Sequence, residues 1–255
     1  MSTRVSSLAS SLVRRLGAVG GAVALWWALT NYVWSSNPVI SKLGPEEAIP
    51  SLLSHLADGN GVADIRTSLG RLLVGLIIAM AVGVPLGVLL GLKPAIEAAT
   101  SPIVNFMRMI SPLAWAPVVI VALGVGNRPV IFLISVTAVW PIALGTAAGV
   151  RQVAPAWYAV AQSLGANKSE AIRFVTVPAV RTNVLTSLRL ALGVAWIVLV
   201  PAEMLGVDSG LGYSVLNARD QLDYGLLGAT VLLIGIIGFA LDTTFRRVFA
   251  GSAAQ

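Results

Sequence analysis

Long runs of residues with little or no charge are the feature that most restricts the fold of this chain. A helix that crosses the hydrocarbon core of a bilayer needs about 20 mostly apolar residues. Six stretches are read as such spans: 16–39, 72–92, 102–126, 129–150, 182–205 and 224–241. Arg108 falls in the first turns of the third stretch, and the fifth contains Arg189 and Glu203 near its ends. The sequence therefore predicts an all-α polytopic membrane protein, a bundle of six transmembrane helices forming a single domain over 1–255.

The composition excludes the main alternatives to a membrane protein. Hydrophobic residues make up 56% of the chain and charged residues only 11%, whereas soluble domains carry about 25% charged residues. A soluble enzyme is close to excluded, and so is a disordered chain, which requires low hydrophobicity. The chain has no cysteine, which excludes disulfides, thiolate catalysis and cysteine-bound metal clusters.

The distribution of Lys and Arg predicts the topology. An even number of spans puts both termini on one side, and a cytoplasmic placement leaves 12 of the 17 cations inside. The other five, which lie outside, are Lys42, Arg66, Arg71, Arg128 and Arg219. This excess satisfies the positive-inside rule, so the net charge of +6 reflects topology and not nucleic-acid binding. Arg14 and Arg15 before the first apolar run resemble a signal peptide, but the run exceeds the usual 7–15 residues and is read as a retained helix.

Small residues at helical spacing predict close packing of the helices. Gly83, Gly87 and Gly91 recur every four residues, and so do Gly145 and Gly149. Such stripes let membrane helices approach each other where no hydrophobic force drives their association.

The segment 151–181 is too polar to span a membrane and too long for a simple loop. Residues 156–164 read as a short helix, and Gly165 supplies the left-handed conformation that ends it. Asn167 and Glu170 have the spacing of a capping box at the start of a second helix, which Pro178 is expected to end. The residues alone leave two readings open: a surface that docks a cytoplasmic partner, and an amphipathic hairpin that lies on lipid.

Several motifs resemble binding-protein-dependent ABC importer permeases, in the branch that serves nitrate, sulfonate, taurine and bicarbonate. Residues 161–166 followed by 174–178 look like the "EAA" loop of that family. Four further segments are similar to its helices and to the loop after its fifth helix: 71–75 with 83–87, 111–117, 202–205 and 210–213. Together these matches cover roughly 60–250. The chain departs from the family pattern at Ala159, where the family usually has Glu, and at Val160, where it has Ala.

The resemblance implies the type I ABC importer permease fold and a transport subunit with no catalysis of its own. It implies two ABC ATPase subunits that use ATP and Mg²⁺, while this chain binds no cofactor or metal. It also implies a second permease copy that forms a homodimer, an external solute-binding protein, a bacterial inner membrane and a small solute, an anion being favoured. The ATPase would contact Ala159, Ala161, Ser163, Leu164, Gly165, Ala166, Lys168, Glu170, Arg173 and Pro178.

The residues that meet the solute are harder to identify. Ionisable groups within a span are functional candidates, but those near span ends can also reach the interface. The interface is favoured for Arg189, and Glu203 is left open between the two roles. The candidates for a translocation path are Asn105, Ser111, Trp115, Thr137, Trp140 and Glu203.

Two other classes of function remain as alternatives. A secondary transporter or channel would need no ATPase, but the chain shows no convincing inverted repeat and no mid-span carboxylate. An intramembrane enzyme would need a polar catalytic cluster, and the single His55 lies in an expected outer loop. The nearest string to a Walker A loop, 165–169, lacks the glycine before its lysine. The chain is therefore expected to depend on a separate ATPase.

Overall fold

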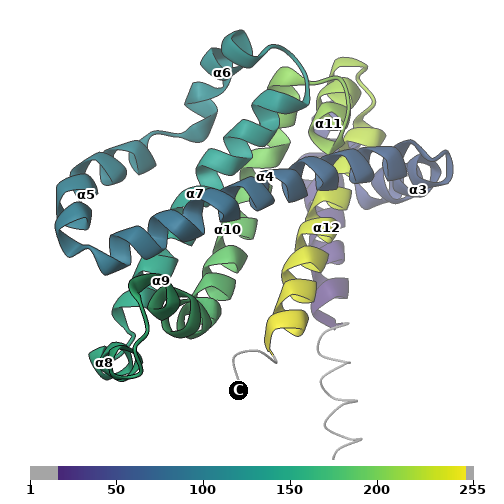
Figure 1. The fold of residues 1–255 in the computed structure, drawn as a ribbon. Helices are drawn as coiled ribbons and strands as arrows, with labels where there is room; N and C mark the ends of the chain where they lie inside the picture. Colours follow the sequence, from purple (N-terminus) through teal and green to yellow (C-terminus); the bar gives the residue numbers. More distant parts are fainter. Residues whose placement is uncertain (1–16, 251–255) are drawn as a thin grey trace, which may run out of the picture. The chain divides into compact units, whose positions relative to one another are not determined.

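The computed structural model describes residues 17–250, and every regular element within this range is a helix (Figure 1). Contacts divide the chain into two compact units, Met1–Val62 with Ser214–Gly235 and Ala63–Tyr213 with Ile236–Gln255. The helices α4 (Asn60–Leu92), α11 (Leu211–Asp220) and α12 (Tyr224–Ala250) each contribute residues to both units. The single domain over 1–255 stays a prediction, and the contacts define two compact units within the chain.

The described part of the first unit begins with a helix over 17–28 that continues as the π-helix η1 (Leu29–Val33). Two short helices follow, α2 (Pro38–Ser41) and α3 (Pro45–Ala57). Asn37 starts α2 because its side chain accepts hydrogen bonds from the backbone N–H groups of Val39 and Ile40. The outer loop expected around His55 is instead the last turn of α3.

Two contacts illustrate how the helices of the first unit are joined. The indole N–H of Trp26 donates to the carbonyl of Leu43 at 3.1 Å. A Cβ placed on Gly228 of α12 would lie 3.2 Å from the Cβ of Ala48 in α3, and Ala48 is fully buried. The first half of α12 therefore packs closely on α3.

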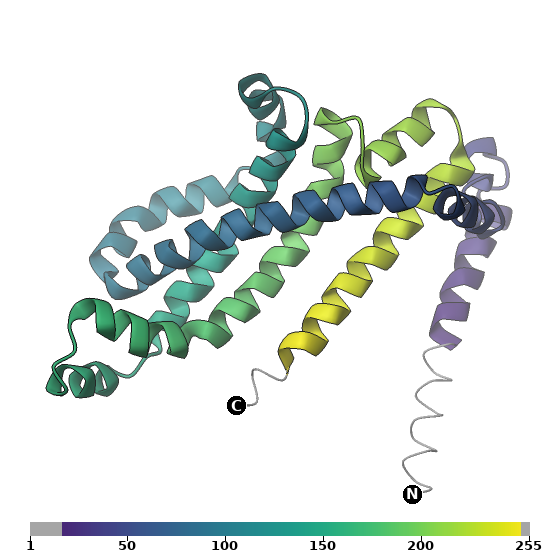
Figure 2. The same cartoon turned by 45° about the vertical axis from the view of Figure 1, so that its right-hand side comes forward.

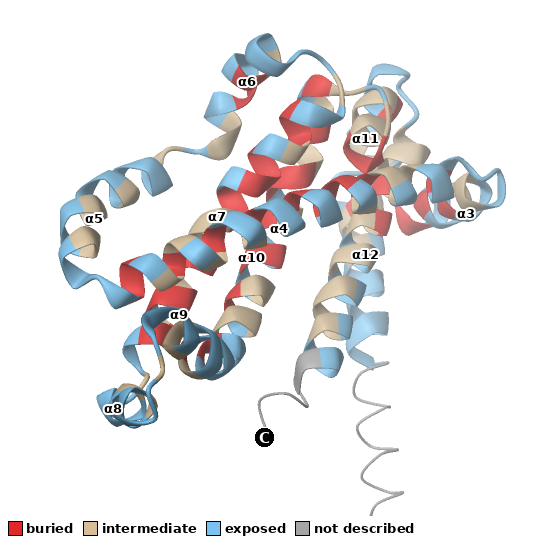
Figure 3. Cartoon of the chain, in the orientation of Figure 1, coloured by how far each residue is buried: buried red, intermediate tan, exposed pale blue. Residues whose placement is uncertain are grey.

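The second unit contains α4 from Ala63 onward, α5 (Pro94–Met109), the 3₁₀ turn η2 (Pro112–Trp115) and α6 (Ala116–Leu123). The chain continues through α7 (Asn127–Arg151), α8 (Pro155–Ser163), α9 (Lys168–Ala171), the π-helix η3 (Ile172–Thr176) and α10 (Val177–Gly206). The start of α11 and the second half of α12 complete the unit. Its buried residues gather on α7 and α10, whereas α5 has none (Figure 3).

The predicted glycine stripe of α4 faces α7. A Cβ on any of four glycines of α4 would meet a side chain of α7 that lies 59 positions later in the chain. The four pairs are Gly75 with Ile134, Gly83 with Ile142, Gly87 with Thr146 and Gly91 with Val150. A constant offset means that the two helices run parallel. Gly145 and Gly149 of α7 face Ser187 and Asn183 of α10, whose numbers fall as the glycine numbers rise, so these two helices are antiparallel.

The helices α5 and α6 form one broken span and not the continuous helix expected over 102–126. The pair is bent by 80° at a break after Met109. Arg151 at the end of α7 bonds Glu97 near the start of α5, while the N–H of Gly126, beside the start of α7, donates to Gly206 at the end of α10. The bent pair therefore leads from one end of α7 to the other.

Four helices of the described residues are long and apolar enough to cross a membrane, or five when the bent pair counts as one span. They correspond to the predicted spans 72–92, 129–150, 182–205, 224–241 and, as the bent pair, 102–126. The first predicted span, 16–39, starts outside the described residues, and its described helix ends at Val33.

Pro178 does not end the helix in which it lies, contrary to expectation. The segment Lys168–Gly206 is continuous, with the π-helix η3 directly before Pro178. Proline lacks an N–H and its ring crowds the carbonyl four residues earlier. The wider π turn relieves this constraint, because its hydrogen bonds join residues five apart.

Candidate coupling segment and solute cavity

The segment 151–181 contains the first of the two short helices that the sequence predicts, α8, whereas the second helix begins at Lys168 and continues into α10. Gly165 ends the first with φ of +83°, a conformation that residues with a Cβ rarely adopt. Asn167 and Glu170 form a complete capping box at the start of α9: the N–H of Glu170 donates to Asn167 Oδ1 at 3.0 Å, and the N–H of Asn167 donates to Glu170 Oε2 at 2.8 Å. The hydroxyls of Tyr158 and Thr176 lie 3.0 Å apart and join α8 to η3.

This segment lies where α7 ends and α10 begins, beyond the packed part of the second unit (Figures 1 and 2). Two of the ten predicted coupling residues, Ala161 and Ala166, are half-buried. The other eight are exposed: Ala159, Ser163, Leu164, Gly165, Lys168, Glu170, Arg173 and Pro178.

Apolar side chains dominate the exposed surface of α8 and the turn after it. Trp157 is 63% exposed and Leu164 is 83% exposed, and α8 has no charged residue. The position where the resembling family has Glu is an exposed alanine, Ala159. Exposed apolar groups in this number mark a surface that contacts another protein or a membrane.

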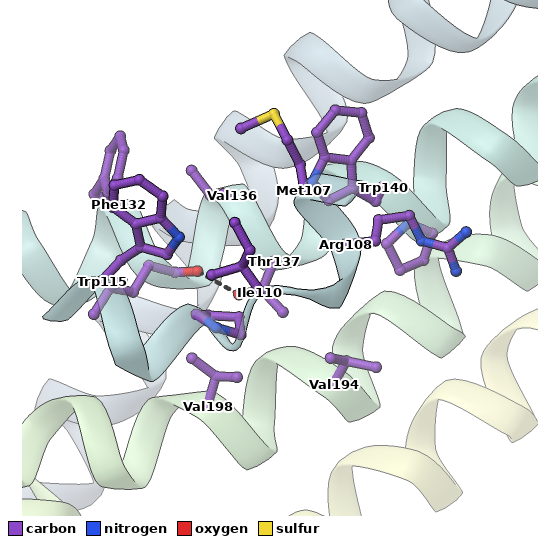
Figure 4. Close-up of a pocket in the computed structure, with 13 residues that line it drawn as sticks. Met107, Arg108, Ile110, Trp115, Phe132, Val136, Thr137, Trp140, Val194 and Val198 are labelled. Atoms are coloured by element: carbon purple, nitrogen blue, oxygen red, sulfur yellow. Dashed lines mark hydrogen bonds between the residues drawn. The ribbon is translucent and has the colours of Figure 1, made fainter. Parts of the chain in front are cut away.

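A cavity of about 450 Å³ lies between α5, η2, α7 and α10 (Figure 4). Most of its lining is aliphatic or aromatic, and its only charged group is Arg108, at the end of α5. The lining residues are Met107, Arg108, Ile110, Pro112, Trp115, Phe132, Leu133, Val136, Thr137, Trp140, Pro141, Val194 and Val198.

The cavity contains three of the six predicted path residues, Trp115, Thr137 and Trp140. Asn105 is exposed on α5 beside Ser101, and Ser111 is exposed at the break between α5 and η2; neither lines the cavity. Arg108 and Phe132 also line the cavity, although neither was predicted as a path residue. Arg108 carried a usable signal, because it is a charged residue within a predicted span.

Glu203 lies away from this cavity, in a buried polar network. Its Oε1 is 2.7 Å from Nη1 of Arg71 on α4, and the two side chains are 0% and 4% exposed. The Ser68 hydroxyl and the N–H of Gly212 also donate to the carboxylate, at 2.8 and 3.0 Å. Arg71 in turn donates to Asn127 at the start of α7 at 2.7 Å. Through these hydrogen bonds, the carboxylate of Glu203 on α10 connects α10 to α4 and to the chain after α10.

Gly210 is required beside this network. Its φ is +100°, and a Cβ there would lie 2.6 Å from Oε1 of Glu203. Arg71 also donates to the backbone carbonyl of Ser209 at 2.7 Å. The motif at 210–213 therefore holds the chain against the buried carboxylate.

Arg189 also has a partner. Its Nε lies 2.9 Å from Oδ1 of Asp242, and both side chains are about 40% exposed. The pair connects α10 to the second half of α12. Arg189 lies 12 residues after the start of α10, and its expected position at the membrane interface stays a prediction.

Comparisons with known proteins agree with the resemblance seen in the sequence. The chain is 30% identical to the taurine transport system permease protein TauC of Escherichia coli, over 94% of this chain and 89% of that protein. It is 38% identical to the bicarbonate transport system permease protein CmpB of Synechococcus elongatus, over 69% of this chain and 63% of that protein. A putative ABC transporter permease of Methanocaldococcus jannaschii is 33% identical over 93% of this chain and 90% of its own length.

A solved structure shares the fold. A chain of the MetNI methionine ABC transporter in an inward-facing conformation superposes with a TM-score of 0.64 at 18% identity, over 76% of this chain and 97% of that one. The family model of the binding-protein-dependent transport system inner membrane component matches residues 83–250, more than half of the chain. The protein is therefore a member of this family, the multi-pass permease subunits of ABC transporters.

Proposed function

We propose that two copies of this chain form the membrane path of an ATP-driven importer for a small anionic solute. An external binding protein delivers the solute, and a separate ATPase subunit docks on the segment 151–181 of each copy. The observation that carries the proposal is the exposed helix–Gly165–helix segment in a chain of this family. Relatives named for taurine, bicarbonate and nitrate support an anion, because the solutes in their names share an oxyanion group.

The segment 151–181 can transmit motion because it is joined rigidly to the membrane helices. The segment Lys168–Gly206 is one continuous helical run, and the contact between Tyr158 and Thr176 holds α8 against it. A displacement of the segment by a closing ATPase would therefore move α10 directly. Since α10 packs closely on α7, both helices would move together.

The missing glutamate alters the proposed contact with the ATPase. Ala159 cannot form an ion pair, while Trp157 and Leu164 present apolar surface nearby on the same segment. We infer that the ATPase docks mainly through apolar contact with these two side chains.

Reconstitution of the complete importer tests the proposal. The chain should co-purify with a P-loop ATPase, and liposomes holding both proteins should take up nitrate, bicarbonate or taurine only with ATP and the binding protein. Uptake by the permease alone, without ATPase, would indicate a secondary transporter or channel and overturn the proposal.

A further inference from the structure

We propose that the cavity between α5, η2, α7 and α10 is a solute-binding site within the membrane, in which Arg108 binds the anionic group of an organic anion. The inference rests on the proposed function, since it concerns the solute that the importer carries.

Arg108 is placed to bind an anion. It forms no hydrogen bond or ion pair with the described residues, whereas Arg71, Arg151 and Arg189 each pair with a carboxylate. Arg108 is exposed in the last turn of α5, so its guanidinium is accessible to a solute. A guanidinium offers a planar fork of donors that matches an oxyanion.

The remaining polar groups of the cavity suit the same charge. Trp115 and Trp140 each carry an indole N–H, which can only donate. None of the described lining residues is an Asp or Glu, so no fixed negative charge opposes an anion. Figure 4 shows Arg108 and Trp140 toward one end of the cavity and Trp115 and Phe132 toward the other.

The size and the apolar lining select among anions. A cavity of about 450 Å³ falls within the range of about 300–1,000 Å³ that is typical of sites for organic ligands. Four apolar side chains of the lining offer no group that would replace the water around a nitrate or bicarbonate ion: Phe132, Val136, Val194 and Val198. They would instead bury an alkyl or aryl group. The site therefore fits an anion with an apolar part, such as an organic sulfonate, better than a small inorganic ion.

The broken span supports a site at this position. Ile110 and Pro112 line the cavity, and they lie at the break where α5 and α6 are bent by 80°. Non-helical backbone is tolerated at membrane depth where it is buried in protein or lines a cavity. Discontinuous helices near the midplane also form the solute sites of many transporters.

A quenching experiment on the assembled importer tests the proposal. The importer is placed in nanodiscs of phosphatidylcholine and titrated with 4-nitrobenzenesulfonate, whose nitroaryl group quenches tryptophan fluorescence on contact. We expect saturable quenching that hexanesulfonate reverses and that nitrate and bicarbonate do not. The Trp115→Phe/Trp140→Phe variant should lose most of the quenching, which would locate the probe in the cavity.

Charge variants identify the role of Arg108. Arg108→Gln should weaken binding by about tenfold or more, the loss expected for a charge-assisted hydrogen bond, and Arg108→Lys should keep part of the affinity. The matched control is Arg128→Gln, which removes an exposed cation that does not line the cavity. Co-elution of the permease with the ATPase in size-exclusion chromatography would show that each variant is assembled.

Three results would overturn the proposal: no saturable quenching, equal affinity in Arg108→Gln and the wild type, or full displacement by nitrate at the concentration of hexanesulfonate. If an anionic lipid added to the nanodiscs abolishes binding, the site belongs to a lipid headgroup and not to the solute. Failure of the proposed function is distinguishable, because it would appear as absence of ATP-dependent uptake while sulfonate binding at Arg108 persists.

Discussion

Glu203 of α10 accepts a hydrogen bond from Arg71 of α4 at 2.7 Å, and both side chains are almost fully removed from solvent. The two residues are 132 positions apart in the chain. Each has further partners, so the ion pair is the centre of a satisfied network and not an isolated contact. Such networks stabilise one arrangement of helices strongly, because breaking any member leaves a charge buried without a partner.

Arg71→Met should therefore destabilise the protein by about 3–5 kcal/mol, because Glu203 would remain buried and unpaired. Thermal unfolding in detergent measures the effect. Arg71→Met/Glu203→Leu should recover part of the loss, since a buried pair replaced by apolar groups is often near neutral.

The exposed pair of Arg151 and Glu97 provides the control for this prediction. Its side chains are 41% and 30% exposed, so Glu97→Gln should change the stability by at most about 1 kcal/mol. Equal effects of Arg71→Met and Glu97→Gln would contradict the role assigned to the buried network.

The stripe of glycines on α4 yields a second prediction. A Cβ on Gly87 would collide with the backbone carbonyl of Ala143, which cannot move without shifting α7. Gly87→Ala should therefore lower stability by about 1–3 kcal/mol, the usual cost of overpacking. Gly70→Ala on the same helix meets nothing within 4 Å and should be tolerated. Melting temperatures of the two variants in one detergent make the comparison.

The sequence predicted close packing at this stripe, because glycines at a spacing of four residues lie on one face of a helix, but it did not identify α7 as the partner. It could not predict the pairing of Glu203 with Arg71, because no local pattern connects residues so far apart in the chain. For Arg71 the sequence predicted only a position on the outer side of the membrane. The resemblance had pointed to 202–205 and 210–213 together, and the structure shows the physical reason: Gly210 and Gly212 lie directly against Glu203.

The break between α5 and α6 was not predicted, for a different reason. Residues 102–126 are as apolar as a continuous span, and Pro112 is compatible with either a kink or a break. Beyond the bend of 80°, η2 and α6 pack against α7 and α10, and the sequence of one segment does not encode such long-range contacts. The cavity at this break was missed in part for the same reason, because residues from four elements line it.

The proposed topology gives a third prediction, which the absence of cysteine in the natural chain makes simple to test. Ser169→Cys, in the segment 151–181, should be labelled only by reagents that reach the cytoplasm. Ser36→Cys, in the exposed turn after η1, should react with an impermeant maleimide on intact spheroplasts. Labelling of both cysteines from the same side would contradict the predicted arrangement, in which both termini are cytoplasmic.

Gly165 is the subject of a fourth prediction. Its φ of +83° disfavours a β-branched residue, although nothing lies within 4 Å of the position. Gly165→Val should therefore distort the turn between α8 and α9 and abolish ATP-driven transport, while membrane insertion stays normal. Gly165→Asn is the matched control, because asparagine adopts this conformation readily, and it should retain transport. Full transport by Gly165→Val would show that the turn does not transmit the motion of the ATPase.

The apolar character of the coupling segment leads to a fifth prediction. Ion pairs on a surface weaken as salt rises, whereas burial of Leu164 and Trp157 does not depend on charge. The complex of permease and ATPase should therefore persist in 1 M NaCl. Leu164→Ser should reduce co-purification of the ATPase at any salt concentration, because Leu164 is 83% exposed and available to a partner.

Lys168→Gln is the control for the apolar contact, since Lys168 is exposed on the same segment but carries charge. If Lys168→Gln weakens the complex more than Leu164→Ser does, or if high salt alone dissociates it, docking is electrostatic. In that event the cations of α9 and η3, Lys168 and Arg173, would contact the ATPase. Persistence in salt together with loss in Leu164→Ser would instead show that docking is mainly apolar.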